Sequence, residues 1–241
     1  MGNDRERQRP VPANRQSAAV SAFLEQVASL PTRVRPAAAK GRLFFAMDAT
    51  ASREPTWDHA SRIQGEMFEA ASNFGGIEIQ LVYYRSYAEC KASRWLRTAA
   101  ELHAAMRVVT CAAGETQIER VLRHAIAAAR DERLDALVFV GDAMEESADT
   151  LAQLAGELAL LTVPVFVFHE GNDPVVARVF REIARLSRGA YCPFDSSSAV
   201  ELKALLGAVA AYAAGGRQAL VDYSRRAGGS TLLLARQIDG S

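Results

Sequence analysis

The 241-residue sequence has few cysteines and histidines, and this excludes two common kinds of site. Its three cysteines, Cys90, Cys111 and Cys192, lie far apart, are odd in number and form no Cys-x-x-Cys pair. Neither a disulfide framework nor a cysteine-based zinc site is therefore expected. The four histidines share no short ligand spacing with one another or with a cysteine. A reduced, cytoplasmic compartment fits this composition best.

Long apolar runs are also missing from the pattern of the sequence. No apolar segment is expected to approach the length of roughly 18 residues that a membrane-spanning helix needs. The first six residues, MGNDRE, lack the apolar core of a signal peptide. We therefore expect no membrane location.

Net charge is absent as well, because 28 basic residues balance 28 acidic ones. The charges are unevenly placed: residues 1–42 hold eight basic and three acidic residues, and residues 43–216 carry a net charge of −7. An acidic body is a poor surface for nucleic acid, so no nucleic-acid partner is expected. We interpret the basic residues 1–16 as a mobile tail, with a basic binding arm as the alternative.

What the sequence does contain is an alternation of strand-like and helix-like segments. Such an alternation predicts a mainly parallel sheet with helices on both faces, that is, a doubly wound α/β fold. The second and third strands are expected to form an antiparallel hairpin at one edge. The predicted strands are 42–48, 77–84, 89–96, 136–140, 163–168 and 190–192. The predicted helices cover about 57–71, 98–109, 116–130, 147–160 and 197–212, and a further helix is expected to begin at Asp173-Pro174.

A single main domain is expected over residues 40–213. Residues 1–39 are interpreted as a basic, partly disordered extension with one short amphipathic helix outside the domain, because Pro31 and Pro36 end its helical pattern. Residues 214–241 are interpreted as a C-terminal tail.

Oxygen-bearing side chains lie at and just after the end of the first predicted strand. They are Asp48, Thr50 and Ser52. Thr116 opens a later helix, and Asp142 follows the strand 136–140. Open α/β sheets bind ligands outside the carboxyl ends of their strands, so these side chains are expected at one edge. Magnesium and similar hard cations prefer oxygen ligands and usually keep several waters. The five residues therefore predict a site for Mg²⁺, or for Mn²⁺ or Ca²⁺, with one position left open.

The open position is expected to take an Asp or Glu side chain of a partner protein, since neutral hydroxyls leave the metal electrophilic. Arg53, Glu54, Trp57 and Glu145 are expected to form a rim around it. No activated nucleophile or positioned base is seen nearby, so the sequence favours binding over catalysis.

These residues resemble the metal-ion-dependent adhesion site (MIDAS) of von Willebrand factor A (VWA) domains, which reads Asp-x-Ser/Thr-x-Ser, then Thr, then Asp. The segment 48–52 matches the first element, Thr116 the second and Asp142 the third. The resemblance covers about residues 40–213 and implies a Rossmann-like domain of the bacterial cytoplasmic type. It also implies protein partners, and related cytoplasmic members often serve AAA-type ATPases, chelatases or stress systems.

Two other interpretations stay open. Asp48 and the acids after Gly141 faintly resemble haloacid-dehalogenase phosphatases, but that chemistry needs a second acid where Thr50 stands. Alternatively, Asp48, Thr116 and Asp142 only cap backbone amides, the site is structural or vestigial, and one of the tails carries the interaction. The oligomeric state is not predicted.

Overall fold

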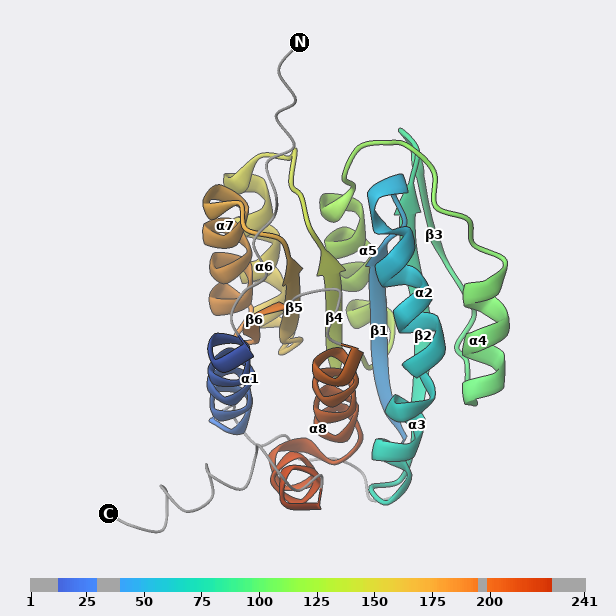
Figure 1. Ribbon diagram of the computed structural model, residues 1–241, viewed down its shortest axis with the longest axis vertical. Coiled ribbons are helices and arrows are strands. Elements are labelled where there is room, and N and C mark those ends of the chain that lie inside the picture. The colour runs from blue at the N-terminus through green and yellow to red at the C-terminus, as the bar shows by residue number, and fades with distance from the viewer. Residues whose placement is uncertain (1–12, 30–39, 195–198, 227–241) are drawn as a thin grey trace.

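The computed structural model describes residues 13–29, 40–194 and 199–226 (Figure 1). Of the predicted mobile tail at 1–16, residues 1–12 lie outside the described residues, and residues 13–16 belong to a helix, which corrects that part of the prediction. The last residues of the predicted C-terminal tail, 227–241, also lie outside the described residues.

A six-stranded sheet forms the centre of the molecule, with the strand order β3-β2-β1-β4-β5-β6. Five strands are parallel, and β3 pairs with β2 in the antiparallel sense at one edge (Figure 1). The predicted doubly wound α/β fold and its antiparallel edge hairpin are therefore confirmed. The strands are β1 (Gly41–Asp48), β2 (Ile77–Arg85), β3 (Glu89–Ala92), β4 (Ala136–Gly141), β5 (Val165–Glu170) and β6 (Ala190–Phe194).

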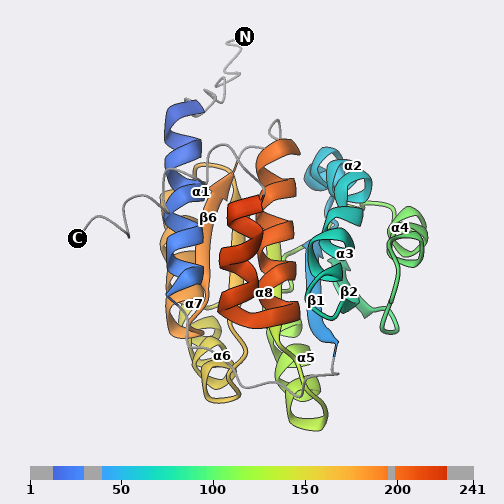
Figure 2. The same ribbon diagram turned by 90° about the horizontal axis from the view of Figure 1, so that it is seen from below.

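Helices cover both faces of this sheet, as Figures 1 and 2 show. One face carries α1 (Ala13–Ala28), α2 (Glu54–Ile63), α3 (Gly65–Ser72), α4 (Ala99–Arg107) and α8 (Ala199–Arg226). The other face carries α5 (Ile118–Asp131), α6 (Ala148–Leu160) and α7 (Pro174–Leu186). A short 3₁₀ turn, η1 (Ala51–Arg53), precedes α2.

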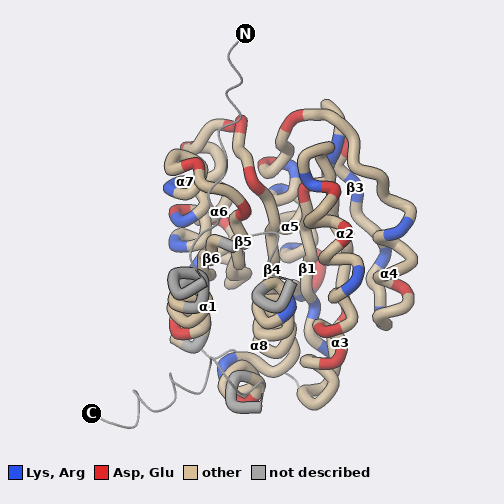
Figure 3. The backbone as a smooth tube through the Cα atoms, viewed as in Figure 1, with Lys and Arg blue, Asp and Glu red and all other residues tan. Residues whose placement is uncertain are grey.

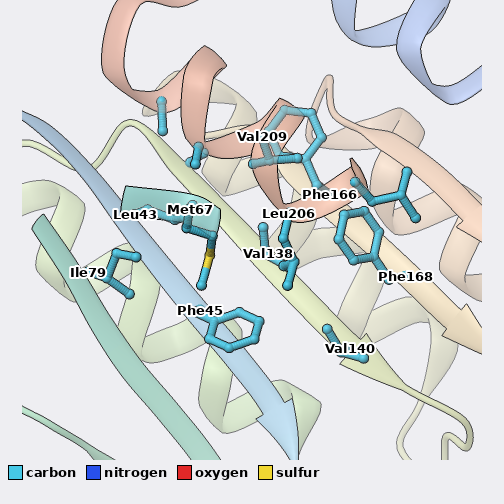
Figure 4. Packing of buried hydrophobic residues seen from close by; sticks show 14 of the residues in the cluster. Leu43, Phe45, Met67, Ile79, Val138, Val140, Phe166, Phe168, Leu206 and Val209 are labelled. Carbon is cyan, nitrogen blue, oxygen red and sulfur yellow. The ribbon is translucent and has the colours of Figure 1, made fainter. Parts of the chain in front are cut away.

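The central strand β1 is buried on both faces, which explains why its sequence is apolar without alternation. Leu43 and Phe45 pack on one face against α8 residues such as Leu206 (Figure 4). Phe44 and Ala46 point to the opposite face and join the cluster formed by α5, α6 and α7. A strand held this firmly fixes the position of the loop that follows it.

The short helix predicted outside the domain is α1, and the structure corrects that prediction. Phe23 of α1 is 1% exposed, and its ring centroid lies 6.0 Å from that of Phe166 and 5.4 Å from that of Phe168. The helix contacts β6 and α8 (Figure 2). The prolines that follow a helix limit its length, but they do not determine where its apolar side packs.

The predicted boundary at residue 213 also needs correction, because α8 continues to Arg226. The helix bends sharply at Gly216, whose φ of 69° and ψ of −159° are not helical. The chain then returns along itself, since a Cβ on Gly207 would lie 2.1 Å from the Tyr223 hydroxyl. Leu220 is 1% exposed. Residues up to Tyr223 therefore pack with the domain.

One segment of α8, Leu202–Tyr223, is long and apolar enough to cross a membrane by length and composition alone. This corrects the expectation that no segment approaches that length. Its mean hydropathy is 1.2, and 67% of its apolar window is buried inside the protein. The helix contacts β1 and α3, so its apolar composition is explained by packing on the sheet.

Candidate metal centre

The predicted ligands lie where the strand order reverses. β1 pairs with β2 on one side and with β4 on the other, so the carboxyl ends of β1 and β4 lie next to each other. Asp48 is the last residue of β1, and Asp142 directly follows β4. Such a switch point is where open α/β sheets bind ligands. It lies at the top of Figure 1, where Figure 3 shows acidic residues gathered.

Asp48 is 1% exposed, and two donors hold its carboxylate. Its Oδ1 accepts a hydrogen bond of 2.7 Å from the Thr50 backbone N–H. Its Oδ2 accepts one of 3.1 Å from the hydroxyl of Tyr84, its register partner on β2. The carboxylate is therefore fixed in orientation by its own loop and by the neighbouring strand.

Burial raises the pKa of Asp48 above its ordinary value of 3.8, because the charged form loses solvation. The hydrogen bonds from Thr50 lower this pKa, and the charge of Asp142 raises it again. Burial, and then the Asp48 charge, put the pKa of Tyr84 well above 10.0, so the tyrosine stays protonated as a donor. A bound cation would offset the unfavourable negative charge at Asp48.

The two hydroxyls of the first loop connect Asp48 to Asp142. Thr50 begins the η1 turn, and its Oγ1 lies 3.4 Å from the Ser52 Oγ. The Ser52 Oγ in turn donates a hydrogen bond of 3.3 Å to the Asp142 Oδ2. Asp48, Thr50, Ser52 and Asp142 thus form one continuous series of contacts, in which the first link is the hydrogen bond from the Thr50 backbone N–H to Asp48.

Thr116, the fifth predicted ligand, is bound to two acids that follow Asp142. Its hydroxyl donates to the Glu146 Oε2 at 2.6 Å and accepts from the Glu145 backbone N–H at 2.9 Å. Its own N–H donates to the Glu145 Oε2 at 2.8 Å. Helix α5 starts only at Ile118, so Thr116 does not serve as the helix cap that the alternative interpretation required. The role of Glu146 was missed by sequence reasoning, which took it for an ordinary acid near a helix start.

Gly114 allows the loop that carries Thr116 to lie against the β2–β3 turn. A Cβ on Gly114 would lie 2.2 Å from the Ser86 carbonyl oxygen, closer than any side chain permits. The Gln117 side-chain amide donates to the carbonyls of Arg85 and Ser86 at 3.2 and 3.1 Å. These contacts fix the position of Thr116 relative to β2.

Two of the four predicted rim residues are buried. Arg53 is 3% exposed and pairs with Asp142 and Glu170, and Trp57 is 4% exposed and donates to the Met106 carbonyl oxygen at 3.2 Å. Both face inward because a helical spacing of four places them on the same side. Glu54 and Glu145 are exposed.

Glu170 was missed by the sequence analysis. It is the last residue of β5, so the same reasoning about acids at strand ends would have found it.

The donor set fits a hard divalent cation in kind. Asp48 and Asp142 supply two negative charges, and Thr50, Ser52 and Thr116 supply neutral oxygens. Water molecules would fill the remaining coordination positions of Mg²⁺. The part of the chain that the structure describes contains no group of three or more His, Cys, Asp or Glu that could hold a metal. A site here would therefore be of the mixed carboxylate and hydroxyl type.

No family model matches the sequence, and no curated protein matches it. Solved structures do match the fold. The VWA domain of SpRpn10 superposes with a TM-score of 0.54 at 11% identity, over 67% of this chain and 94% of that one. Proximal thread matrix protein 1 from the mussel byssus gives 0.57 at 14% identity, over 73% of this chain and 48% of that one. This chain therefore spans about half the length of the mussel protein.

The mussel protein has also been solved with a zinc-occupied MIDAS motif, and that structure superposes with a TM-score of 0.54 at 14% identity, over 73% of this chain and 47% of that one. At such low identities the likeness concerns the fold. Together with the strand order and the switch point described above, it shows that this chain has the fold of a von Willebrand factor A domain.

Proposed function

We propose that this chain is a protein-interaction module in which a divalent cation recruits an Asp or Glu side chain of a partner protein. The ligands in this proposal are Asp48, Thr50, Ser52, Thr116 and Asp142. The observation that carries it is the contact of 3.3 Å between Ser52 and Asp142, which joins two elements of the motif across the ends of β1 and β4. The VWA fold supports it, as does the neighbour with a zinc-occupied MIDAS.

Each residue has a distinct part in this proposal. A bound cation would supply a positive centre with a coordination position open to a carboxylate. Asp48, held by Tyr84, provides a buried charge of fixed orientation. The Thr116 hydroxyl donates a hydrogen bond to Glu146 and accepts one from the Glu145 N–H. One lone pair of the hydroxyl oxygen is then left for a metal ion. Ser52 is exposed, so a partner can reach this edge of the site.

We propose no catalytic step. A phosphatase of the haloacid-dehalogenase pattern needs a second carboxylate two positions after the first, and Thr50 stands there. His169, at the end of β5, is fully buried, and burial lowers its pKa, so it is a neutral core residue without access to a substrate. Binding is therefore the function that these residues support best.

Magnesium is the proposed ion, with Mn²⁺ or Ca²⁺ as replacements, because the oxygens are hard donors. A cytoplasmic location and a role as adaptor to an AAA-type ATPase or a stress-related complex are further parts of the proposal. The adaptor role rests on the resemblance to VWA domains, and the cytoplasmic location rests on that resemblance and on the cysteine content. The proposal that the partner presents an Asp or Glu rests on the open coordination position, which would take a carboxylate.

Affinity capture tests this proposal. The immobilised chain is incubated with cell lysate, with and without a chelator, beside Asp142→Ala and the control Asp149→Asn, an exposed acid in the first turn of α6. The proposal expects the same captured protein to be lost with the chelator and with Asp142→Ala, and kept with Asp149→Asn. Capture that survives both treatments contradicts it.

A second candidate is a structural site that holds no metal. The observation that favours it is the Arg53 Nη1, which lies 3.4 Å from the Asp142 Oδ2 and already supplies a positive charge there. The interaction would then rest on the basic residues 1–12 or on residues 227–241, both outside the described residues. Chelator-resistant capture that is lost when residues 1–12 are deleted would favour this candidate.

A further inference from the structure

We propose that Arg53 is an internal cation of the metal site, which competes with a divalent ion for Asp142 and thereby keeps the affinity for the ion low. This inference rests on the proposed function, since it concerns the same site. The first element of the family pattern quoted above ends at Ser52, and its later elements are Thr116 and Asp142, so the pattern gives Arg53 no role.

The geometry places the guanidinium against a carboxylate oxygen of Asp142, one of the proposed metal ligands. The Arg53 Nη1 lies 3.4 Å from the Asp142 Oδ2, and the same oxygen accepts the hydrogen bond from the Ser52 hydroxyl at 3.3 Å. One carboxylate oxygen therefore faces both a proposed metal ligand and a fixed positive charge. A divalent ion that binds this oxygen has to share it with Arg53 or displace it.

Glu170 holds the guanidinium from its other side. The Arg53 Nη2 forms an ion pair with the Glu170 Oε2, and the Thr56 hydroxyl donates to the same oxygen. Because Arg53 is only 3% exposed, it needs such a partner to be buried at all. The local backbone agrees with this arrangement, since Arg53 ends the η1 turn and caps α2 with φ −94° and ψ −1°. Arg53 is thus held in place by Asp142 after β4 and by Glu170 at the end of β5, and cannot swing out to meet a partner.

The balance of charge gives the direction of the effect. Asp48, Asp142 and Glu170 carry three negative charges and Arg53 one positive charge, so the cluster has a net charge of −2. Like charges within a few ångströms repel strongly where water is scarce, so Arg53 disfavours a bound divalent ion. A divalent ion that does bind brings the net charge of the cluster to zero, with the positive charge of Arg53 still beside Asp142.

The test is a calorimetric titration with Mn²⁺ alone. It compares the unaltered chain with Arg53→Gln/Glu170→Gln, which removes the pair without leaving a buried charge unpaired. The matched control is Arg185→Gln/Glu182→Gln, a second close Arg–Glu pair on α7. The expected result is that the Arg53/Glu170 variant binds Mn²⁺ more tightly by on the order of tenfold, while the α7 variant binds as the unaltered chain does.

A single variant, Glu170→Gln, is expected to act in the opposite direction. Without the Glu170 charge, Arg53 has only Asp142 as its anionic partner, so Mn²⁺ binding weakens. A purely structural role for the pair would lower the thermal stability of both variants and would not move their affinities in opposite directions. Thermal unfolding without metal, run beside the titrations, confirms that each variant is folded.

The outcomes separate this inference from the proposed function. If the unaltered chain binds no Mn²⁺ and the Arg53/Glu170 variant does, the inference holds and the metal-dependent function of the natural site fails. If both bind and the variant binds more tightly, the inference holds and so does the metal site on which the proposed function depends. If the folded variant binds no more tightly than the unaltered chain, or does not bind, the inference is overturned.

Discussion

The Ser52 Oγ lies 3.3 Å from the Asp142 Oδ2, although 90 positions separate the two residues. Their proximity follows from the strand order, because β1 and β4 are neighbours in the sheet. The loops after these strands therefore meet at the switch point. Predictions about the site and the fold around it follow from this geometry.

Replacing Asp48 by Asn is expected to stabilise the metal-free protein and to abolish metal binding. Asn keeps the acceptor for the Thr50 N–H and removes a negative charge that burial disfavours. A gain of about 1 kcal/mol would raise the melting temperature by roughly 2–4 °C in a domain of this size. Thermal unfolding in the presence of a chelator measures this, and a variant that melts lower than the unaltered chain contradicts it.

The same residue predicts a pH dependence. Because the folded pKa of Asp48 is raised, the folded protein binds this proton more tightly than the unfolded chain does. The penalty from Asp48 is thus fully present above the folded pKa and is relieved as the pH falls toward the ordinary value of 3.8. The difference in melting temperature between Asp48→Asn and the unaltered chain should shrink over that range. A difference that stays constant or grows as the pH falls would show that Asp48 is not the group responsible.

Replacing Glu146 by Gln is expected to weaken Mn²⁺ binding by on the order of tenfold, with little change in stability. The two carboxylate oxygens accept from the Thr116 hydroxyl and from the Glu119 N–H, at 2.6 and 3.2 Å. A carboxamide has one acceptor oxygen, and the fixed N–H of Glu119 would take it. The amide NH₂ would then donate a hydrogen bond to the Thr116 hydroxyl oxygen. This hydrogen bond would occupy the lone pair that a metal ion needs.

A calorimetric titration of Glu146→Gln with Mn²⁺ measures this effect, and Asp149→Asn serves as the matched control because it also neutralises an acid at the start of α6. Equal affinities of the two variants would mean that Thr116 is not a ligand.

Replacing Gly114 by Ala is expected to cost about 1–3 kcal/mol of stability and to weaken metal binding, because the added Cβ collides with backbone. It would lie 2.2 Å from the Ser86 carbonyl oxygen and push the loop of Thr116 away. The control is Gly156→Ala within α6, where a Cβ meets nothing within 4 Å. That change should stabilise the protein by up to about 1 kcal/mol. Chemical denaturation measures both, and the same sign of change in both variants would contradict the account.

Replacing Phe23 by Ala is expected to destabilise the whole domain by about 3–5 kcal/mol, the usual cost of emptying an aromatic core position. Phe23 is 1% exposed and packs edge-to-face on Phe166 and Phe168 of β5. Denaturation followed by fluorescence and by circular dichroism should give one coincident, shifted transition. An unchanged midpoint would restore the view that α1 is separate from the domain.

The fold and the site differ in how much of each was predictable from the sequence. The order of strands and helices followed from apolar runs such as 43–47, which report burial directly. The association of α1 and of residues 214–223 with the domain was missed, because Phe23 and Leu220 are ordinary apolar residues whose partners are distant in sequence. Strand-end position predicted Asp48 and Asp142. The inward orientation of Arg53 depends on Glu170, which only the register of β4 and β5 brings near.

The central claim is that the strand-end oxygens hold a divalent ion, and a titration of the unaltered chain with Mn²⁺ tests it most directly. Ser52→Ala removes one hydroxyl at the site, and Ser72→Ala removes a serine hydroxyl on α3 that donates to the Glu69 carbonyl oxygen. The account predicts saturable binding of about one ion per chain, weakened on the order of tenfold by Ser52→Ala and unaffected by Ser72→Ala. Absence of saturable binding by the unaltered chain, or equal binding by the two serine variants, would contradict it.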